Sequence, residues 1–176
     1  MKVSIFNGSP KKDGETAAVT SVLKDIAKVR GADADEHFLY HMGIRGCLTC
    51  GYGPGRENAM KMIAAFISSD LPVLACPIIM WRISDSLNAL IDLMYHVCRY
   101  DDETMERIAG KRVAIVLTAD DGGAAVTDAT ELLRRFCGLL GMEVAGVLTV
   151  THAPAEDMNA PASIEKIRSF AEMILG

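Results

Sequence analysis

The chain has 176 residues, half of them apolar, and a formal net charge of −5 at pH 7. A chain of this length can bury one core, so we expect residues 1–176 to form a single domain. The negative charge and the scattered basic residues argue against a nucleic-acid binder. No apolar segment is long enough for a membrane helix, because Asp70, Arg82 and Asp85 flank the longest one. We therefore expect neither a nucleic-acid partner nor a membrane.

The N-terminus and the cysteines indicate a cellular compartment. The first apolar run ends at Asn7-Gly8, which is too early for the apolar region of a signal peptide. Five cysteines are an odd set, which is typical of reduced thiols and not of a secreted disulfide framework. We expect a cytoplasmic protein.

Hydrophobic periodicity predicts five strands that alternate with five helices. In chain order these are strand 2–7, helix 15–29, strand 35–40, a loop 41–55, helix 57–68, strand 71–77, helix 84–97, strand 111–118, helix 125–140, strand 143–150 and helix 162–175. The unbroken apolar runs 73–76 and 113–117 are typical of a parallel sheet with helices on both faces. The pattern predicts an α/β fold, a flavodoxin-like three-layer doubly wound sandwich whose five-stranded parallel sheet has the order 2-1-3-4-5.

The first strand leads directly into a loop of small and charged residues that opens a helix. This segment reads Asn7-Gly8-Ser9-Pro10-Lys11-Lys12-Asp13-Gly14-Glu15-Thr16. Backbone N–H groups at a helix N-terminus lack intrahelical partners and favour an anion, and Ser9 and Thr16 add hydroxyl donors. The glycine spacing matches neither the dinucleotide fingerprint nor the Walker pattern, which leaves a mononucleotide phosphate. Strand, turn and helix also follow one another for purely topological reasons, so the loop alone does not decide between these interpretations.

Two other strand ends are predicted to lie beside this loop. The third strand is followed by Pro77, Ile78, Ile79, Met80 and Trp81, and the fourth by Asp120, Gly122 and Gly123. In this topology ligands bind beyond the carboxyl ends of strands 1, 3 and 4. The first group offers an apolar and aromatic wall, while the glycines let backbone approach a ligand closely. A flat heteroaromatic ring with a phosphorylated tail fits this set.

The chain resembles the flavodoxin-like NAD(P)H-dependent FMN reductase group, in particular its iron-sulfur flavoprotein branch. Residues 8–16 are similar to that group's Gly-Ser-Pro-Arg-Lys-x-Gly-Asn-Thr phosphate loop. The segment from Pro77 through Ser84 and Leu87 to Ile91-Asp92 is similar, without a gap, to its Pro-Val-Tyr-Trp-x-x-x-Ser-x-x-Leu-Lys-x-Phe-Ile-Asp-Arg motif. The resemblance implies FMN as cofactor, NADH or NADPH as reductant, and a homodimer or homotetramer. The implied cofactor-binding residues are Ser9, Lys11, Thr16, Pro77, Ile78, Ile79, Met80, Trp81, Asp120, Gly122 and Gly123.

Cys47 and Cys50 form a Cys-x-x-Cys pair where the iron-sulfur branch carries clustered cysteines. Gly53 stands at the place of the third family cysteine and residues 54–62 contain no fourth, which excludes a four-thiolate cluster within this loop. Three interpretations stay open: a structural turn, which we favour, a reversible dithiol, and half of a metal site shared between subunits. We assign no metal ligands. The other cysteines, at 76, 98 and 137, are expected to be small buried apolar residues.

Three functions are compatible with these features. The first is an oxidoreductase in which FMN accepts hydride from NADH or NADPH and passes electrons to a quinone, a free flavin or another small acceptor. The cofactor carries this chemistry, so we name no catalytic side chain. The second is a flavodoxin-like electron carrier, which the modest net charge disfavours. The third is a binding or regulatory module without flavin, which is suggested by departures from the family pattern at Glu15, Ile79, Trp81, Asn88 and Leu93.

Trp81, the only tryptophan, has three possible roles. Its ring could stack on a flavin, fill the space that a flavin would occupy, or lie in a subunit interface. The helix expected around residues 87–97 is also rich in apolar residues, which suggests packing against a second subunit. A homo-oligomer is therefore expected from the sequence as well as from the resemblance.

Overall fold

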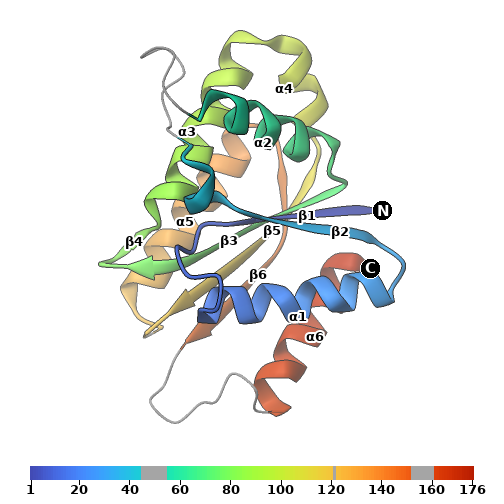
Figure 1. The fold of residues 1–176 in the computed structure, drawn as a ribbon, viewed down its shortest axis with the longest axis vertical. Coiled ribbons are helices and arrows are strands. Elements are labelled where there is room, and N and C mark those ends of the chain that lie inside the picture. The colour runs from blue at the N-terminus through green and yellow to red at the C-terminus, as the bar shows by residue number, and fades with distance from the viewer. Residues whose placement is uncertain (45–54, 121, 152–160) are drawn as a thin grey trace.

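The computed structural model describes residues 1–44, 55–120, 122–151 and 161–176 (Figure 1). Its central sheet has five parallel strands, namely β1 (Lys2–Asn7), β2 (Asp33–Phe38), β3 (Leu71–Ile79), β5 (Arg112–Ala119) and β6 (Glu143–Thr151). They are hydrogen-bonded in the order β2-β1-β3-β5-β6. With the short strand β4 (Arg82–Ile83) left out, this is the order 2-1-3-4-5, which confirms the flavodoxin-like arrangement expected from the sequence.

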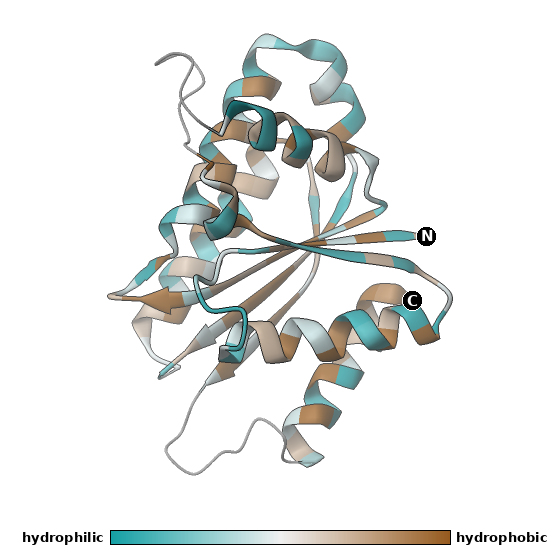
Figure 2. Cartoon of the chain, in the orientation of Figure 1, coloured by the Kyte–Doolittle hydropathy of each residue, from teal (hydrophilic) through white to brown (hydrophobic). Residues whose placement is uncertain are grey.

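Helices cover both faces of the sheet (Figure 1). One face carries α1 (Glu15–Val29) and α6 (Pro161–Leu175), and the other carries α2 (Arg56–Ser68), α3 (Asp85–Tyr100), α4 (Asp102–Ile108) and α5 (Ala124–Leu139). Figure 2 shows the apolar strands between these two helical layers. Among the helices of the described residues, none is both long enough and apolar enough to cross a membrane.

The alternation of side chains along β1 explains why there are two core regions. Successive residues of a strand point to opposite faces, so Ile5 packs with α1 and α6 while Phe6 packs with α2 and α3. In the central strands β3 and β5, both faces are covered. Their runs 73–76 and 114–117 are fully buried, as their unbroken apolar sequence predicts.

Three elements were not predicted from the periodicity. The first is the 3₁₀ helix η1 (Leu39–Met42). It contains Leu39 and Tyr40, so the second strand ends at residue 38 and spans residues 33–38 instead of 35–40. Helix α4 follows α3 after Asp101, whose carboxylate accepts the hydroxyl of Thr104 at 2.6 Å. This bond lowers the pKa of Asp101. The third unpredicted element is strand β4.

Strand β3 continues to Ile79 and folds back as β4, which makes a hairpin at the edge of the sheet. Ile78 pairs with Ile83 and Ile79 with Arg82 in antiparallel register. The connecting residues Met80 and Trp81 have φ angles of 48° and 61°. Turns with positive φ at both central residues usually contain Asn-Gly, and other residues cost about 1–2 kcal/mol each in this conformation. The dipeptide Met-Trp therefore gave no turn signal in the sequence.

Gly8 lies where the end of β1 meets the start of α3. A Cβ at this position would overlap the Ser84 hydroxyl and come within 3.0 Å of the Leu87 Cβ. The Ser86 hydroxyl also donates to the Gly8 carbonyl at 2.9 Å. The absence of a side chain therefore allows the loop after β1 to contact α3 directly.

We predict that Gly8→Ala lowers the free energy of unfolding by about 1–3 kcal/mol, because the new methyl group overpacks this contact. Urea denaturation measures the change. The matched control is Gly138→Ala in α5, where an added Cβ meets nothing within 4 Å. This control should be neutral or raise stability by about 0.5–1 kcal/mol, as for glycine within a helix. Equal losses in both variants would contradict the close contact at Gly8.

Candidate functional site

The pairing of the strands brings three predicted site segments to one edge of the sheet. Asn7 of β1 lies beside Ala75 of β3, and Ala75 lies beside Val116 of β5. Because these strands are parallel, the loop 8–14, the β3–β4 hairpin and the residues Asp120, Gly122 and Gly123 all follow strand ends at this same edge (Figure 1). Asp120, Gly122 and Gly123 are exposed there.

The loop after β1 is held by hydrogen bonds with its own residues. The Ser9 N–H donates to the side-chain oxygen of Asn7 at 2.8 Å. The Ser9 hydroxyl donates to the Lys11 carbonyl and accepts the Lys11 N–H, both at 3.2 Å. Ser9 is only 4% exposed, so its hydroxyl shapes the loop from within. The side chains of Lys11 and Lys12 are exposed and add positive charge.

Helix α1 begins at this loop without a side-chain cap. Its N-cap residue is Gly14, so no side-chain acceptor of that residue covers the first-turn N–H groups. These groups carry the positive end of the dipole of a 15-residue helix. An uncapped helix start after a preformed loop with two neighbouring lysines has the donor chemistry that a phosphomonoester needs. The residues present therefore fit the phosphate end of FMN.

The hydroxyl of Thr16 bonds to a residue that sequence reasoning did not select. Its Oγ1 lies 2.7 Å from the Oγ1 of Thr118, at the end of β5, and both threonines are buried. The two hydroxyls have two protons, and their mutual bond uses one. The pair therefore joins α1 to β5 and retains one donor proton.

The loop is also braced from the side of β2. The His41 ring contacts the Pro10 carbonyl through Nε2 at 3.1 Å, and a carbonyl can only accept, so the ring donates. The Lys12 ammonium lies 5.8 Å from the centre of the Phe38 ring, within the range of a cation–π contact. Sequence reasoning missed His41 and Phe38 because both are distant from loop 8–14 along the chain and belong to no motif.

Beneath the loop lies a polar network that the sequence analysis also missed. It joins Asn7, Thr20, Lys24 and Glu36, from the end of β1, from α1 and from β2. The one signal in the sequence is Asn7, a polar residue that ends an apolar strand directly before Gly8.

The tip of the hairpin is apolar and exposed. Ile79 is 51% exposed, and Met80 and Trp81 are each 70% exposed. Trp81 is therefore not part of the interior core, and its three proposed roles stay open. Pro77 and Ile78, closer to the sheet, are half-buried.

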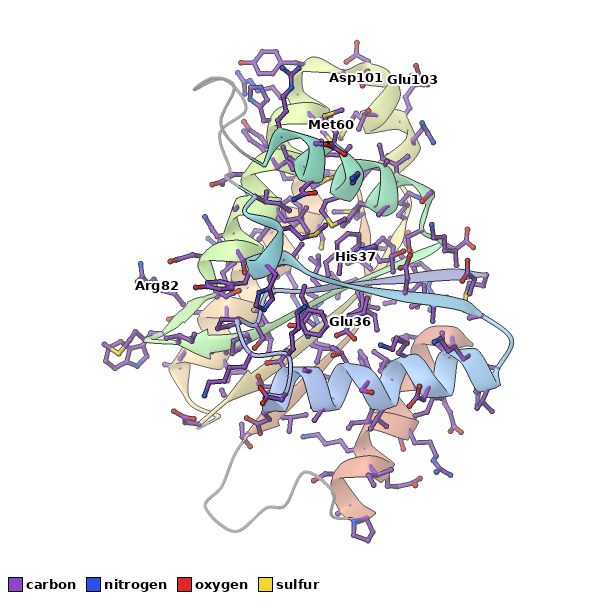
Figure 3. The ribbon with its side chains drawn as sticks, in the orientation of Figure 1. Glu36, His37, Met60, Arg82, Asp101 and Glu103 are labelled. Carbon is purple, nitrogen blue, oxygen red and sulfur yellow. The ribbon has the colours of Figure 1, made fainter. Side chains whose placement is uncertain are left out.

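A hollow of about 280 Å³ lies beside the hairpin, toward α3 and α5. It is lined by Trp81, Arg82, Ile83, Asp85, Asn88, Asp128, Ala129 and Leu132. Figure 3 shows Arg82 on the hairpin. Of the predicted site residues, only Trp81 lines this hollow.

The cysteines fall into two groups. Cys47 and Cys50 lie outside the described residues, so the interpretations of this pair stay open. The other three cysteines are buried, as expected. Burial raises the pKa of Cys76 to about 12 and that of Cys98 and Cys137 to about 11, so these three remain neutral thiols at pH 7.

Comparison with known protein families shows the family to which the chain belongs. Residues 1–155 match the family described as NADPH-dependent FMN reductase. The chain belongs to this family. The match includes both motifs on which the resemblance was based. A search of curated proteins found no match.

Solved structures with low sequence identity share the fold. An FMN-dependent NADH-azoreductase from Bacillus anthracis, in complex with FMN, is 13% identical, has a TM-score of 0.75, and covers 100% of both chains. An NAD(P)H:quinone oxidoreductase from Methanothermobacter marburgensis is 16% identical, with a TM-score of 0.71 over 97% of this chain and 94% of the other. A Streptococcus pneumoniae flavodoxin is 15% identical, with a TM-score of 0.62 over 99% and 98%. The last comparison supports the flavodoxin-like fold directly.

Proposed function

We propose that this member of the FMN reductase family binds FMN and uses NADH or NADPH to reduce a quinone, a free flavin or another small acceptor. The observation that carries the proposal is the preformed loop 8–14, which opens an uncapped helix at the edge where three strands end. The family match and the FMN-dependent reductases among the similar folds support it.

The chain's own residues would bind and orient the cofactor. The backbone of loop 8–14, the Lys11 ammonium and the Thr16–Thr118 pair would hold the phosphate. Glu15, the first residue of α1, adds one carboxylate near this loop, whose charge the exposed ammonium groups of Lys11 and Lys12 would offset. Bound FMN supplies the chemistry of accepting hydride and releasing electrons.

The ring of FMN would lie against the segments that follow β3 and β5. Pro77, Ile78 and Ile79 give an apolar wall at the end of β3. Asp120, Gly122 and Gly123 provide exposed backbone at the end of β5. Met80 and Trp81 keep an apolar hairpin tip in a conformation that costs energy, and such strain is concentrated at functional sites. We propose contact with a ring or with a partner as the role of this tip.

We predict that the purified chain retains FMN after desalting and that its visible flavin absorbance bleaches on anaerobic addition of NADH or NADPH. The double variant Ser9→Ala, Thr16→Ala should bind FMN at least tenfold more weakly, since two hydrogen-bonding hydroxyls worth about 1 kcal/mol each are removed. Ser21→Ala, on the exposed face of α1, is the matched control and should bind FMN as the wild type does.

Other outcomes distinguish the remaining functions. Bound flavin that does not bleach with either nicotinamide would contradict the reductase and favour the electron carrier. A chain that retains no flavin would contradict both and favour a binding module. Unchanged affinity in the double variant would contradict the role of the loop after β1.

We also propose that a second copy of the chain covers the hairpin. The apolar face of α3 does not require a partner, because Leu87, Leu90 and Leu93 are buried in the chain's own core. The argument for a homodimer or homotetramer therefore rests on the hairpin and the hollow beside it. This surface has an exposed apolar tip, a cation at Arg82 and carboxylates at Asp85 and Asp128. A two-fold axis through it would place the cation of each copy near the carboxylates of the other.

We predict that light scattering finds a dimer or tetramer for the wild type and a smaller species for Arg82→Glu at micromolar concentration. Charge reversal removes an attraction in each half of the interface. Adding Asp128→Arg to this variant should restore assembly. Arg168→Glu in α6, on the opposite face of the sheet, is the control and should leave the mass unchanged. A monomeric wild type, or an Arg82→Glu variant with unchanged mass, would overturn this interface.

A further inference from the structure

A buried carboxylate lies beneath the loop after β1. Glu36 belongs to β2, and its side chain is only 5% exposed. Its Oε1 accepts the side-chain amide of Asn7 at 3.0 Å and the hydroxyl of Thr20 at 2.6 Å, while its Oε2 accepts the Lys24 ammonium at 3.0 Å. Figure 3 shows Glu36 on the side of β2 that faces α1 and His37 on the other side. Side chains from β1 and α1 thus meet at one side chain of β2.

The chemistry of these groups fixes the orientation of the Asn7 amide. An ionised carboxylate can only accept hydrogen bonds, so Asn7 must turn its NH₂ group toward Glu36. The amide oxygen then points the other way, toward the Ser9 N–H, which it accepts at 2.8 Å. An amide rotated by half a turn would present its NH₂ group to the Ser9 N–H and its oxygen to the carboxylate. Glu36 and the Ser9 N–H therefore favour the same orientation of the Asn7 amide, which is the one that holds the loop.

The network is fully satisfied and its charge is compensated. Asn7 and Thr20 are completely buried, and the Asn7 amide also donates to the Thr20 hydroxyl at 3.3 Å. The ammonium of Lys24 balances the charge of Glu36, which a buried carboxylate requires. Satisfied networks of this kind rigidify the segments that they join. Here those segments are the end of β1 and the first turns of α1.

We infer that Glu36 is a positioning residue for the phosphate site, and that it acts through Asn7 to preform loop 8–14. This inference rests on the proposed binding of FMN. Glu36 bonds to Asn7, Thr20 and Lys24, and Asn7 in turn accepts the Ser9 N–H, so the network connects Glu36 to the position of the loop. It should therefore control how strongly the chain prefers FMN to riboflavin, which lacks the phosphate.

The test compares the affinities of the full chain for FMN and riboflavin by quenching of flavin fluorescence. Glu36→Gln keeps the shape of the side chain but can present an NH₂ group to Asn7, so residue 36 no longer favours this orientation of the Asn7 amide. We expect the preference for FMN over riboflavin to fall about tenfold, while the affinity for riboflavin changes by about twofold at most. In the flavin-free chain, hydrogen exchange at the Ser9 amide should become faster.

A control separates positioning from a general loss of stability. Ser69→Ala removes another completely buried hydroxyl that bonds to β1, but at the opposite end of the strand, through the Ser4 N–H at 3.1 Å and the Lys2 carbonyl at 3.3 Å. This variant should lose stability and keep the preference for FMN. Thr20→Val, which removes one of the donors to Glu36, provides a second test if Glu36→Gln does not fold. It should reduce the preference about threefold.

Two results would overturn the inference in different ways. If the wild type prefers FMN but a folded Glu36→Gln or Thr20→Val variant retains the full preference, Glu36 does not position the loop and the proposed function stands. If the wild type binds riboflavin as tightly as FMN, or binds neither, the phosphate site itself is wrong and this inference falls with it.

Discussion

Parallel pairing of β1 with both β2 and β3 is the constraint on which the rest of the structure depends. It places the carboxyl ends of β1, β3 and β5 at one edge of the sheet and requires helices on both faces. The loop after β1 is consequently flanked by α1, α3 and β2. Gly8 permits the close approach to α3, and the network around Glu36 connects the loop to β2 and α1.

A loop that binds an anion must be ordered before the anion arrives if binding is to be tight, because ordering on binding costs affinity. In this chain, hydrogen bonds from Asn7 and from the network around Glu36 order the loop after β1. Ser9 is nearly buried and its hydrogen bonds go to Asn7 and Lys11, which leaves the start of α1 to face the edge of the sheet. The hairpin has the opposite character, since Met80 and Trp81 are exposed and adopt strained backbone angles. The loop after β1 and the hairpin thus differ in polarity and exposure.

Much of the fold follows from the sequence because buried parallel strands and amphipathic helices have regular periods. The unbroken apolar runs in β3 and β5 and the alternation of strands with helices were sufficient to predict the strand order, and the loop before α1 was sufficient to propose a phosphate site there. The β3–β4 hairpin could not be predicted, because Met80 and Trp81 are not residues that usually form such a turn. Contacts of Glu36 and Thr118 were missed because they depend on strand pairing and follow no local pattern.

The measurement that tests this account most directly is the shift of backbone amide signals in NMR spectra when FMN or riboflavin is added to the chain. The account predicts that the difference between the two ligands is concentrated at residues 11–16, because only FMN places a phosphate at the start of α1. It also predicts smaller differences at Asp120 and Gly122. Ligand differences concentrated instead at Asp85 and Asp128, beside the hairpin hollow, would contradict the phosphate site.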